Sequence, residues 1–195
     1  LMTTAPMRRL VLEGKDPASW GEQHGEALRD EVREAYAVRL ALTLERTDLG
    51  DEDAVLALGR RHLPLLQRFD AALYEELCGI ARGAGLTPEQ VVVINHYTDL
   101  RDLGRRHLDE RLAQAAGDPG GEEGCSVLFT PSPRGPLLGQ TWDMHGSATD
   151  FVWLLEVPGG PGAGAEDGRT LLFTLAGCVG MTGLTSWGLG MTINN

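Results

Sequence analysis

The spacing of apolar residues changes partway along the chain, from a helical period before residue 117 to short strand-like runs after residue 124. From Trp20 to Leu44 apolar residues recur every three or four positions, which predicts one long amphipathic helix. Similar spacing predicts three further helices, at 52–69, 71–82 and 88–103. Pro64 lies inside the second of these segments, where we expect it to kink or divide the helix.

Helix boundaries are marked by residues that cap free backbone groups. Asp16-Pro17 and Thr87-Pro88 each combine a capping side chain with a proline in the first turn, and so predict helix starts. Gly83-Ala84-Gly85 predicts a helix end, because glycine accepts the left-handed conformation of a C-cap. The run Val91-Val92-Val93-Ile94 is also compatible with a strand, but the cap at Thr87 favours helix.

Short apolar runs bounded by turn residues predict the strands. One lies near the start, at 7–13, and five follow the change of pattern, at 126–130, 137–142, 151–157, 170–175 and 189–193, with a Gly-rich hairpin loop at 158–168. Helices followed by antiparallel strands predict the α+β class. We expect a helical part over 1–124, ending in a Gly-, Pro- and Glu-rich linker, and the start of a β-rich part over 125–195.

Composition and charge narrow the classes of function. A net charge of −11 argues against nucleic acid and anionic membranes as partners, since both attract basic surfaces. We expect no signal peptide and no membrane span, because no apolar run has the length that either requires. Three cysteines without metal-ligand spacing and scattered histidines indicate a reduced, cytoplasmic protein that uses no metal or other cofactor.

The dipeptide Gly124-Cys125 lies at the border between the two parts and suggests specific chemistry. A cysteine nucleophile needs a base, because only a few per cent of a free thiol is ionised at neutral pH. Cleavage of the Gly124–Cys125 bond would supply one, the new α-amine, whose reference pKa is about 7.7–8.0. Glycine suits the position before the cut because it tolerates a strained turn. The alternative is that Cys125 is a small apolar residue at the start of a buried strand.

Three separated stretches carry a family resemblance: Gly21-Glu22-Gln23-His24-Gly25, the segment 75–87 followed by Asn95, and Gly124-Cys125-Ser126 with its continuation at 139–143. In order and spacing they resemble the acyl-coenzyme A:isopenicillin-N acyltransferase family of N-terminal-nucleophile (Ntn) hydrolases, which is related to choloylglycine hydrolase and acid ceramidase. The resemblance spans nearly the whole chain.

The resemblance implies a four-layer αββα Ntn fold, self-cleavage before Cys125, and amide hydrolysis or acyl transfer through an acyl-enzyme on Cys125. It implies that Asp143 positions the new α-amine by a charge-assisted hydrogen bond. Asn194 and Asn195 match the asparagine that closes a later strand in the family, where an amide helps to stabilise the oxyanion. A solvated Asp143 and a turn-forming asparagine pair are the plain alternatives.

Departures from the family pattern leave other functions open. Gln140 stands where some relatives carry Arg, and Thr141 and Thr185 stand where Asn is usual. Relatives also continue with further strands, so we expect a longer protein whose remaining C-terminal part completes the site. The substrate would be a small amide or acyl thioester. The alternatives are an inactive Ntn-fold binding or scaffold protein, and an uncleaved cysteine hydrolase with a histidine base.

Overall fold

The computed structural model describes residues 7–14, 16–102, 125–159 and 168–194. The chain divides into two compact units. The helical unit comprises 14–120 together with Ala176–Val179, and the β unit comprises 1–13, 121–175 and 180–195. Helices and sheets are both present, which is compatible with the expected α+β class. No helix within the described ranges combines the length and apolarity needed to cross a bilayer.

Six helices make up the described part of the helical unit: α1 Pro17–Ala27, α2 Arg29–Arg46, α3 Glu52–Phe69, α4 Ala71–Ala84, α5 Pro88–Asn95 and α6 Tyr97–Asp102. The predicted caps are confirmed. Asp16 accepts a hydrogen bond from the Ser19 amide, and Thr87 and Gln90 form a reciprocal capping box. Gly85 ends α4 in the left-handed conformation, with φ of 67°.

Three of the helix predictions differ in detail from the structure. The single helix expected from Trp20 to Leu44 is broken at Leu28, whose φ of −115° and ψ of 27° are not helical. The break lets α1 pack against α4 while α2 packs against α5. Pro64 does not divide α3, which runs through it from Glu52 to Phe69. The segment predicted at 88–103 is α5 and α6, separated at His96.

Helices α1 and α4 meet backbone to backbone through glycines spaced four residues apart on each helix. A Cβ on Gly21 would lie 2.0 Å from the Glu76 carbonyl oxygen, and one on Gly25 would lie 2.3 Å from the Ile80 carbonyl oxygen. The facing glycines Gly79 and Gly83 are equally confined. No side chain fits at these positions, so glycine is required by the close approach of the two helices.

The core of the helical unit surrounds α5. Its residues Val91–Ile94 are 0% exposed, so the β-branched run that was compatible with a strand forms a fully buried helix. Burial on all sides explains why these four positions show no amphipathic period. Side chains from the neighbouring helices complete this core: Val32, Val55, Leu77, Ile80 and Leu100.

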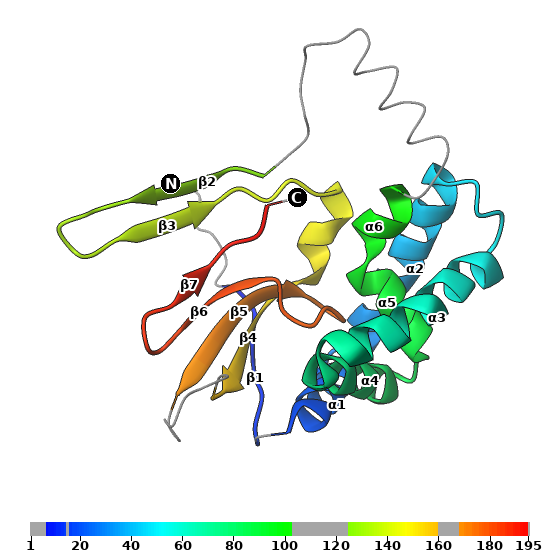
Figure 1. Cartoon of the computed structure of the whole chain (residues 1–195), viewed down its shortest axis with the longest axis horizontal. Helices are drawn as coiled ribbons and strands as arrows, with labels where there is room; N and C mark the ends of the chain where they lie inside the picture. Colours follow the sequence, from blue (N-terminus) through cyan, green and yellow to red (C-terminus); the bar gives the residue numbers. More distant parts are fainter. Residues whose placement is uncertain (1–6, 15, 103–124, 160–167, 195) are drawn as a thin grey trace, which may run out of the picture. The chain divides into compact units, whose positions relative to one another are not determined.

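The β unit contains two sheets (Figure 1). The five-stranded sheet has the order β1-β4-β5-β6-β7, and the two-stranded sheet is the hairpin β2–β3. The strands are β1 Arg9–Val11, β2 Val127–Thr130, β3 Leu137–Gln140, β4 Val152–Pro158, β5 Arg169–Leu175, β6 Thr182–Thr185 and β7 Gly190–Met191. Every predicted strand is present, although the one expected at 189–193 is shorter.

Three features of the β unit were not predicted. β1 pairs parallel with β4, so the larger sheet is mixed and not wholly antiparallel. A 3₁₀ helix, Gly146–Phe151, precedes β4. β6 was missed because Gly183 interrupts its apolar pattern, yet a Cβ there would lie 2.4 Å from the Leu171 carbonyl oxygen, so the close pairing with β5 requires glycine.

The glycine contact between α1 and α4 gives a stability prediction. Gly79→Ala should lower the free energy of unfolding by about 2 kcal/mol or more, because the new methyl group overlaps the backbone of α1. The added Cβ would meet the Ala18 carbonyl oxygen at 2.2 Å. Denaturant unfolding measures the change.

Gly146→Ala is the matched control, since a Cβ there meets no atom within 4 Å. Replacing an unobstructed glycine in a helix by alanine raises the free energy of unfolding by about 1 kcal/mol. Unchanged or increased stability of Gly79→Ala would therefore contradict the close packing of these helices.

Candidate functional site

The hairpin β2–β3 positions the border residue Cys125. Its register runs from Thr130 opposite Leu137 to Val127 opposite Gln140. The pairing continues one step further, because the Thr141 amide donates to the Ser126 carbonyl oxygen at 2.9 Å and the Ser126 amide donates to Thr141 Oγ1, also at 2.9 Å. Cys125 is therefore the residue immediately before Ser126, which belongs to the outermost hydrogen-bonded pair at this end of the hairpin.

Asp143 lies at the same end of this hairpin. It follows Thr141 by two residues, whereas Cys125 precedes Ser126 by one. Extended chain advances about 3.3 Å per residue, so both positions fall within roughly 7 Å of chain from the Ser126–Thr141 pair. Cys125 is half-buried and Asp143 is exposed. Trp142, between Thr141 and Asp143, packs edge-to-face on Phe173 of β5, with 5.7 Å between the ring centroids.

Gln140 brings the last described residues to the same place. Its Oε1 accepts a hydrogen bond from the Ile193 amide at 3.2 Å, and its Nε2 donates to the Ile193 carbonyl oxygen. The amide side chain thus substitutes for a strand neighbour. It holds Asn194, which is exposed, next to the end of the hairpin that carries Cys125.

The structure thus gathers three predicted site residues, Cys125, Asp143 and Asn194, around one end of β2–β3. Gly124 and Asn195 lie outside the described residues, as does the predicted linker over 117–124. Two departures from the family pattern have structural roles here, because Gln140 binds Ile193 and Thr141 binds Ser126. Sequence reasoning treated them as losses and missed this. The available signal was a glutamine and a threonine, two side chains that can form hydrogen bonds, at the end of a predicted strand.

Thr185, the third departure, has a structural role in the turn between β6 and β7. Its amide donates to the Leu189 carbonyl oxygen at 2.8 Å, and its hydroxyl oxygen accepts from the Leu189 amide at 3.1 Å. These bonds close a tight connection that begins at Ser186. Thr185 therefore fixes the turn that leads into β7 and on to Ile193.

The other two cysteines have environments that suit packing. Cys78 is half-buried on α4, and burial raises the pKa of its thiol. Cys178 is buried, with its Sγ 3.8 Å from the Ile94 carbonyl oxygen. A raised pKa makes the Cys78 thiol a weaker nucleophile, and burial limits access to the Cys178 thiol.

The helical unit contains a second polar centre, which sequence reasoning quoted only as part of the family resemblance. His24 of α1 is 0% exposed, and its Nε2 accepts a hydrogen bond from the Gly177 amide at 3.0 Å. The ring proton is therefore on Nδ1, which has no hydrogen-bond partner among the described residues. Burial lowers the pKa of His24 to about 4.

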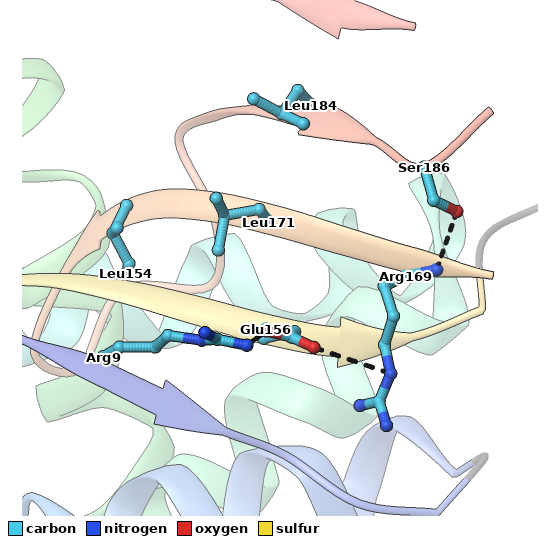
Figure 2. Close-up of a pocket in the computed structure, with 7 residues that line it drawn as sticks. All are labelled: Arg9, Leu154, Glu156, Arg169, Leu171, Leu184 and Ser186. Atoms are coloured by element: carbon cyan, nitrogen blue, oxygen red, sulfur yellow. Dashed lines mark hydrogen bonds and ion pairs between the residues drawn. The ribbon is translucent and has the colours of Figure 1, made fainter. Parts of the chain in front are cut away.

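A shallow hollow of about 330 Å³ lies on the five-stranded sheet (Figure 2). Leu154, Leu171 and Leu184 form its apolar floor. At its rim Glu156 forms ion pairs with Arg9 and with Arg169, the latter at 3.6 Å. None of the predicted site residues lines it. Within the described ranges, no three His, Cys, Asp or Glu side chains gather as metal ligands would.

Comparison with known proteins gives relatives of this chain, and one of them is named as an acyltransferase. The chain is 26% identical over 180 residues to the acyl-coenzyme A:6-aminopenicillanic-acid-acyltransferase 40 kDa form of Emericella nidulans. The match covers 91% of this chain and 44% of the relative, so the chain spans less than half of the length of that protein. No family model matches.

The buried His24 predicts acid sensitivity. In the folded protein it stays neutral to about pH 4, whereas its ordinary pKa is 6.5, so between these values the unfolded chain binds more protons. His24 therefore lowers the free energy of unfolding as pH falls, by at most about 1.4 kcal/mol per pH unit. Glu76 acts in the opposite sense: burial raises its pKa to about 7, and its contribution to stability is lost as pH rises through that value.

Denaturant midpoints at pH 7 and pH 5 test this for the wild type, His24→Gln and Glu76→Gln. His24→Gln should lose less stability on acidification than the wild type, and Glu76→Gln should lose more. Identical pH dependence in the wild type and His24→Gln would show that His24 is not buried in its neutral form.

Proposed function

We propose that this chain is part of a self-cleaving cysteine Ntn enzyme that transfers acyl groups through Cys125. One observation carries the proposal: three candidate residues lie at the same end of the hairpin β2–β3. Cys125 immediately precedes the Ser126–Thr141 pair, Asp143 follows that pair, and Gln140 holds the segment that contains Asn194. The similarity to an acyltransferase, which covers this region, supports it.

Self-cleavage would proceed by attack of the Cys125 thiol on the carbonyl carbon of Gly124. The peptide C–N bond breaks as a C–S bond forms, which leaves a thioester and a free α-amine on Cys125. Water then hydrolyses the thioester to give the Gly124 carboxylate and the free thiol. Both groups needed for later turnover, thiol and amine, are then on one residue.

In acyl transfer the α-amine would accept the thiol proton as sulfur attacks the carbonyl carbon of the substrate. The tetrahedral intermediate collapses to an acyl-enzyme, and the leaving amine or thiol takes the proton back. Water or an acceptor amine then attacks the acyl-enzyme and regenerates the thiol. The acyl donor would be an acyl thioester, since the relative is named for acyl-coenzyme A.

Two polar groups would assist these steps. Asp143 would accept a charge-assisted hydrogen bond from the α-amine and hold it towards the sulfur. The amide of Asn194, or of Asn195, would donate to the oxyanion of the tetrahedral intermediate. Asn194 lies at the correct end of the hairpin because Gln140 binds the residue before it.

The apolar pattern of the hairpin supports the Ntn sandwich as the finer fold, with both units in one domain. Leu128 and Phe129 are adjacent, so their side chains point to opposite faces of the strand, and they are 66% and 67% exposed. A strand that is apolar on both faces is typical of a sheet covered on both sides. The αββα sandwich provides two such covered sheets.

Replacement of the nucleophile tests the proposal. In the full-length protein, the wild type should give two chains, the second beginning at Cys125, and Cys125→Ala should give one chain. Intact mass and N-terminal sequencing distinguish these products. Cys78→Ala is the matched control and should be cleaved like the wild type.

Other outcomes identify the alternative functions. An uncut wild type that still hydrolyses amides would contradict the role of the α-amine and favour a cysteine hydrolase with a histidine base. An uncut and inactive wild type would favour a binding protein.

Asp143→Asn tests the positioning carboxylate. The substitution keeps the shape of the side chain but removes the charge that would hold the α-amine. Hydrogen bonds to charged groups contribute about 1.5–3 kcal/mol, so kcat/KM should fall by roughly 10- to 100-fold. Asp150→Asn, at an exposed position of the 3₁₀ helix Gly146–Phe151, should change the rate little. Equal rates for the two variants would exclude a role for Asp143.

A further inference from the structure

The bend Ala176–Val179 joins β5 to β6 and belongs to the helical unit. Gly177 has φ of +85°, a conformation that favours glycine. A Cβ there would lie 3.0 Å from Ile94 Cδ1 and 3.1 Å from Val32 Cγ1. The bend thus fits closely against side chains of α2 and α5.

Asn95, the last residue of α5, binds the bend through both ends of its amide. Its Nδ2 donates to the Gly177 carbonyl oxygen at 2.9 Å and also to the Val91 carbonyl oxygen at 2.9 Å. Its Oδ1 accepts from the Val179 amide at 3.0 Å. The bond to Val91 fixes the side chain on its own helix, so the amide is oriented to receive the bend.

Two further side chains complete the contact. His24 accepts the Gly177 amide, so the N–H and C=O of this one residue are bound by different helices. Arg39 of α2 is buried and donates from Nη1 to the Ile94 carbonyl oxygen, and the same nitrogen lies 3.9 Å from Cys178 Sγ. Three buried or half-buried polar side chains therefore meet three successive residues of the bend.

We propose that His24, Arg39 and Asn95 form a binding site for the bend, through which the helical segment stays attached to the β-rich segment after the chain is cut between them. We refer to these three residues as the clasp. A cut before Cys125 places the clasp on one piece and the bend on the other. That the chain is cut in nature rests on the proposed function, whereas binding of the bend by the clasp does not.

The clasp is better suited to this role than the other described attachment of the first piece. That attachment is β1, which pairs with β4 over Arg9–Val11, with flanking backbone bonds at Arg8 and Leu12 and an ion pair from Arg9 to Glu156. In the clasp the His24–Gly177 bond is buried and the two Asn95 bonds are part-buried. A donor or acceptor left unpaired in a buried setting costs about 1–3 kcal/mol. Separation of the pieces would leave the Gly177 and Val179 backbone groups without these partners.

An engineered cut in the full chain tests the proposal without relying on self-cleavage. A site for a specific protease is inserted within 103–124 of Cys125→Ala, which cannot cleave itself under the proposed mechanism. After proteolysis, the dissociation constant of the two pieces is measured by dilution and size-exclusion chromatography. Asn95→Ala removes two bonds to the bend, and Gln67→Ala removes an exposed amide of α3 as the matched control.

The cut parent protein should remain a complex. Asn95→Ala should raise the dissociation constant by about 10- to 1000-fold, because two part-buried backbone groups lose their partners. Gln67→Ala should leave the dissociation constant unchanged. Pieces of the parent protein that separate on cutting would overturn the proposal. So would an Asn95→Ala complex as tight as the Gln67→Ala complex.

Hydrogen exchange provides a readout that does not depend on whether a variant folds. In the cut parent protein the Gly177 and Val179 amides should stay protected, since His24 and Asn95 accept their bonds. Exchange at the rate of an unstructured peptide would overturn the proposal. If uncut Asn95→Ala is unfolded, Asn95→Asp replaces it: the acceptor for Val179 remains and the donor to Gly177 is lost, so the dissociation constant should still rise.

Discussion

Much of this structure depends on the hydrogen bonds that His24 and Asn95 form with the backbone of Gly177. They join the first and fifth helices to a loop more than eighty residues further along the chain. Burial of His24 depends in turn on the glycines that bring α1 against α4. The buried Gly177 amide needs an acceptor, which His24 Nε2 provides, so the bend, the two helices and the glycine contact depend on one another.

The candidate site is assembled mainly by backbone pairing between strands, and not by buried side-chain hydrogen bonds. Cys125 is placed by the register of a short hairpin, and Asn194 is placed by the side chain of Gln140, which bonds as a neighbouring strand would. Packing of Trp142 on Phe173 links the hairpin to the larger sheet. A nucleophile, a carboxylate and an amide thus share one hairpin end without any metal-ligand cluster nearby in the described ranges.

Local signals in the sequence predicted the elements well. The caps at Asp16 and Thr87 and the glycine after α4 are where the pattern placed them, because each depends on a few adjacent residues. The break at Leu28, the parallel pairing of β1 and the strand around Gly183 were missed, since each is imposed by a distant partner. Local sequence motifs identified Cys125 and Asp143 as candidates. The structural roles of Gln140, Thr141 and Asn95 could be recognised only once the fold was known. Their bonding partners lie up to 84 residues away.

The central claim is that the sulfur of Cys125 carries the acyl group. The most direct measurement treats the full-length protein with an acyl thioester, quenches it in acid and locates the added acyl mass by peptide mass spectrometry. The account predicts the acyl group on a peptide that begins at Cys125, bound through sulfur and removed by hydroxylamine. Acylation of Cys78 or Cys178 with Cys125 unmodified would contradict it.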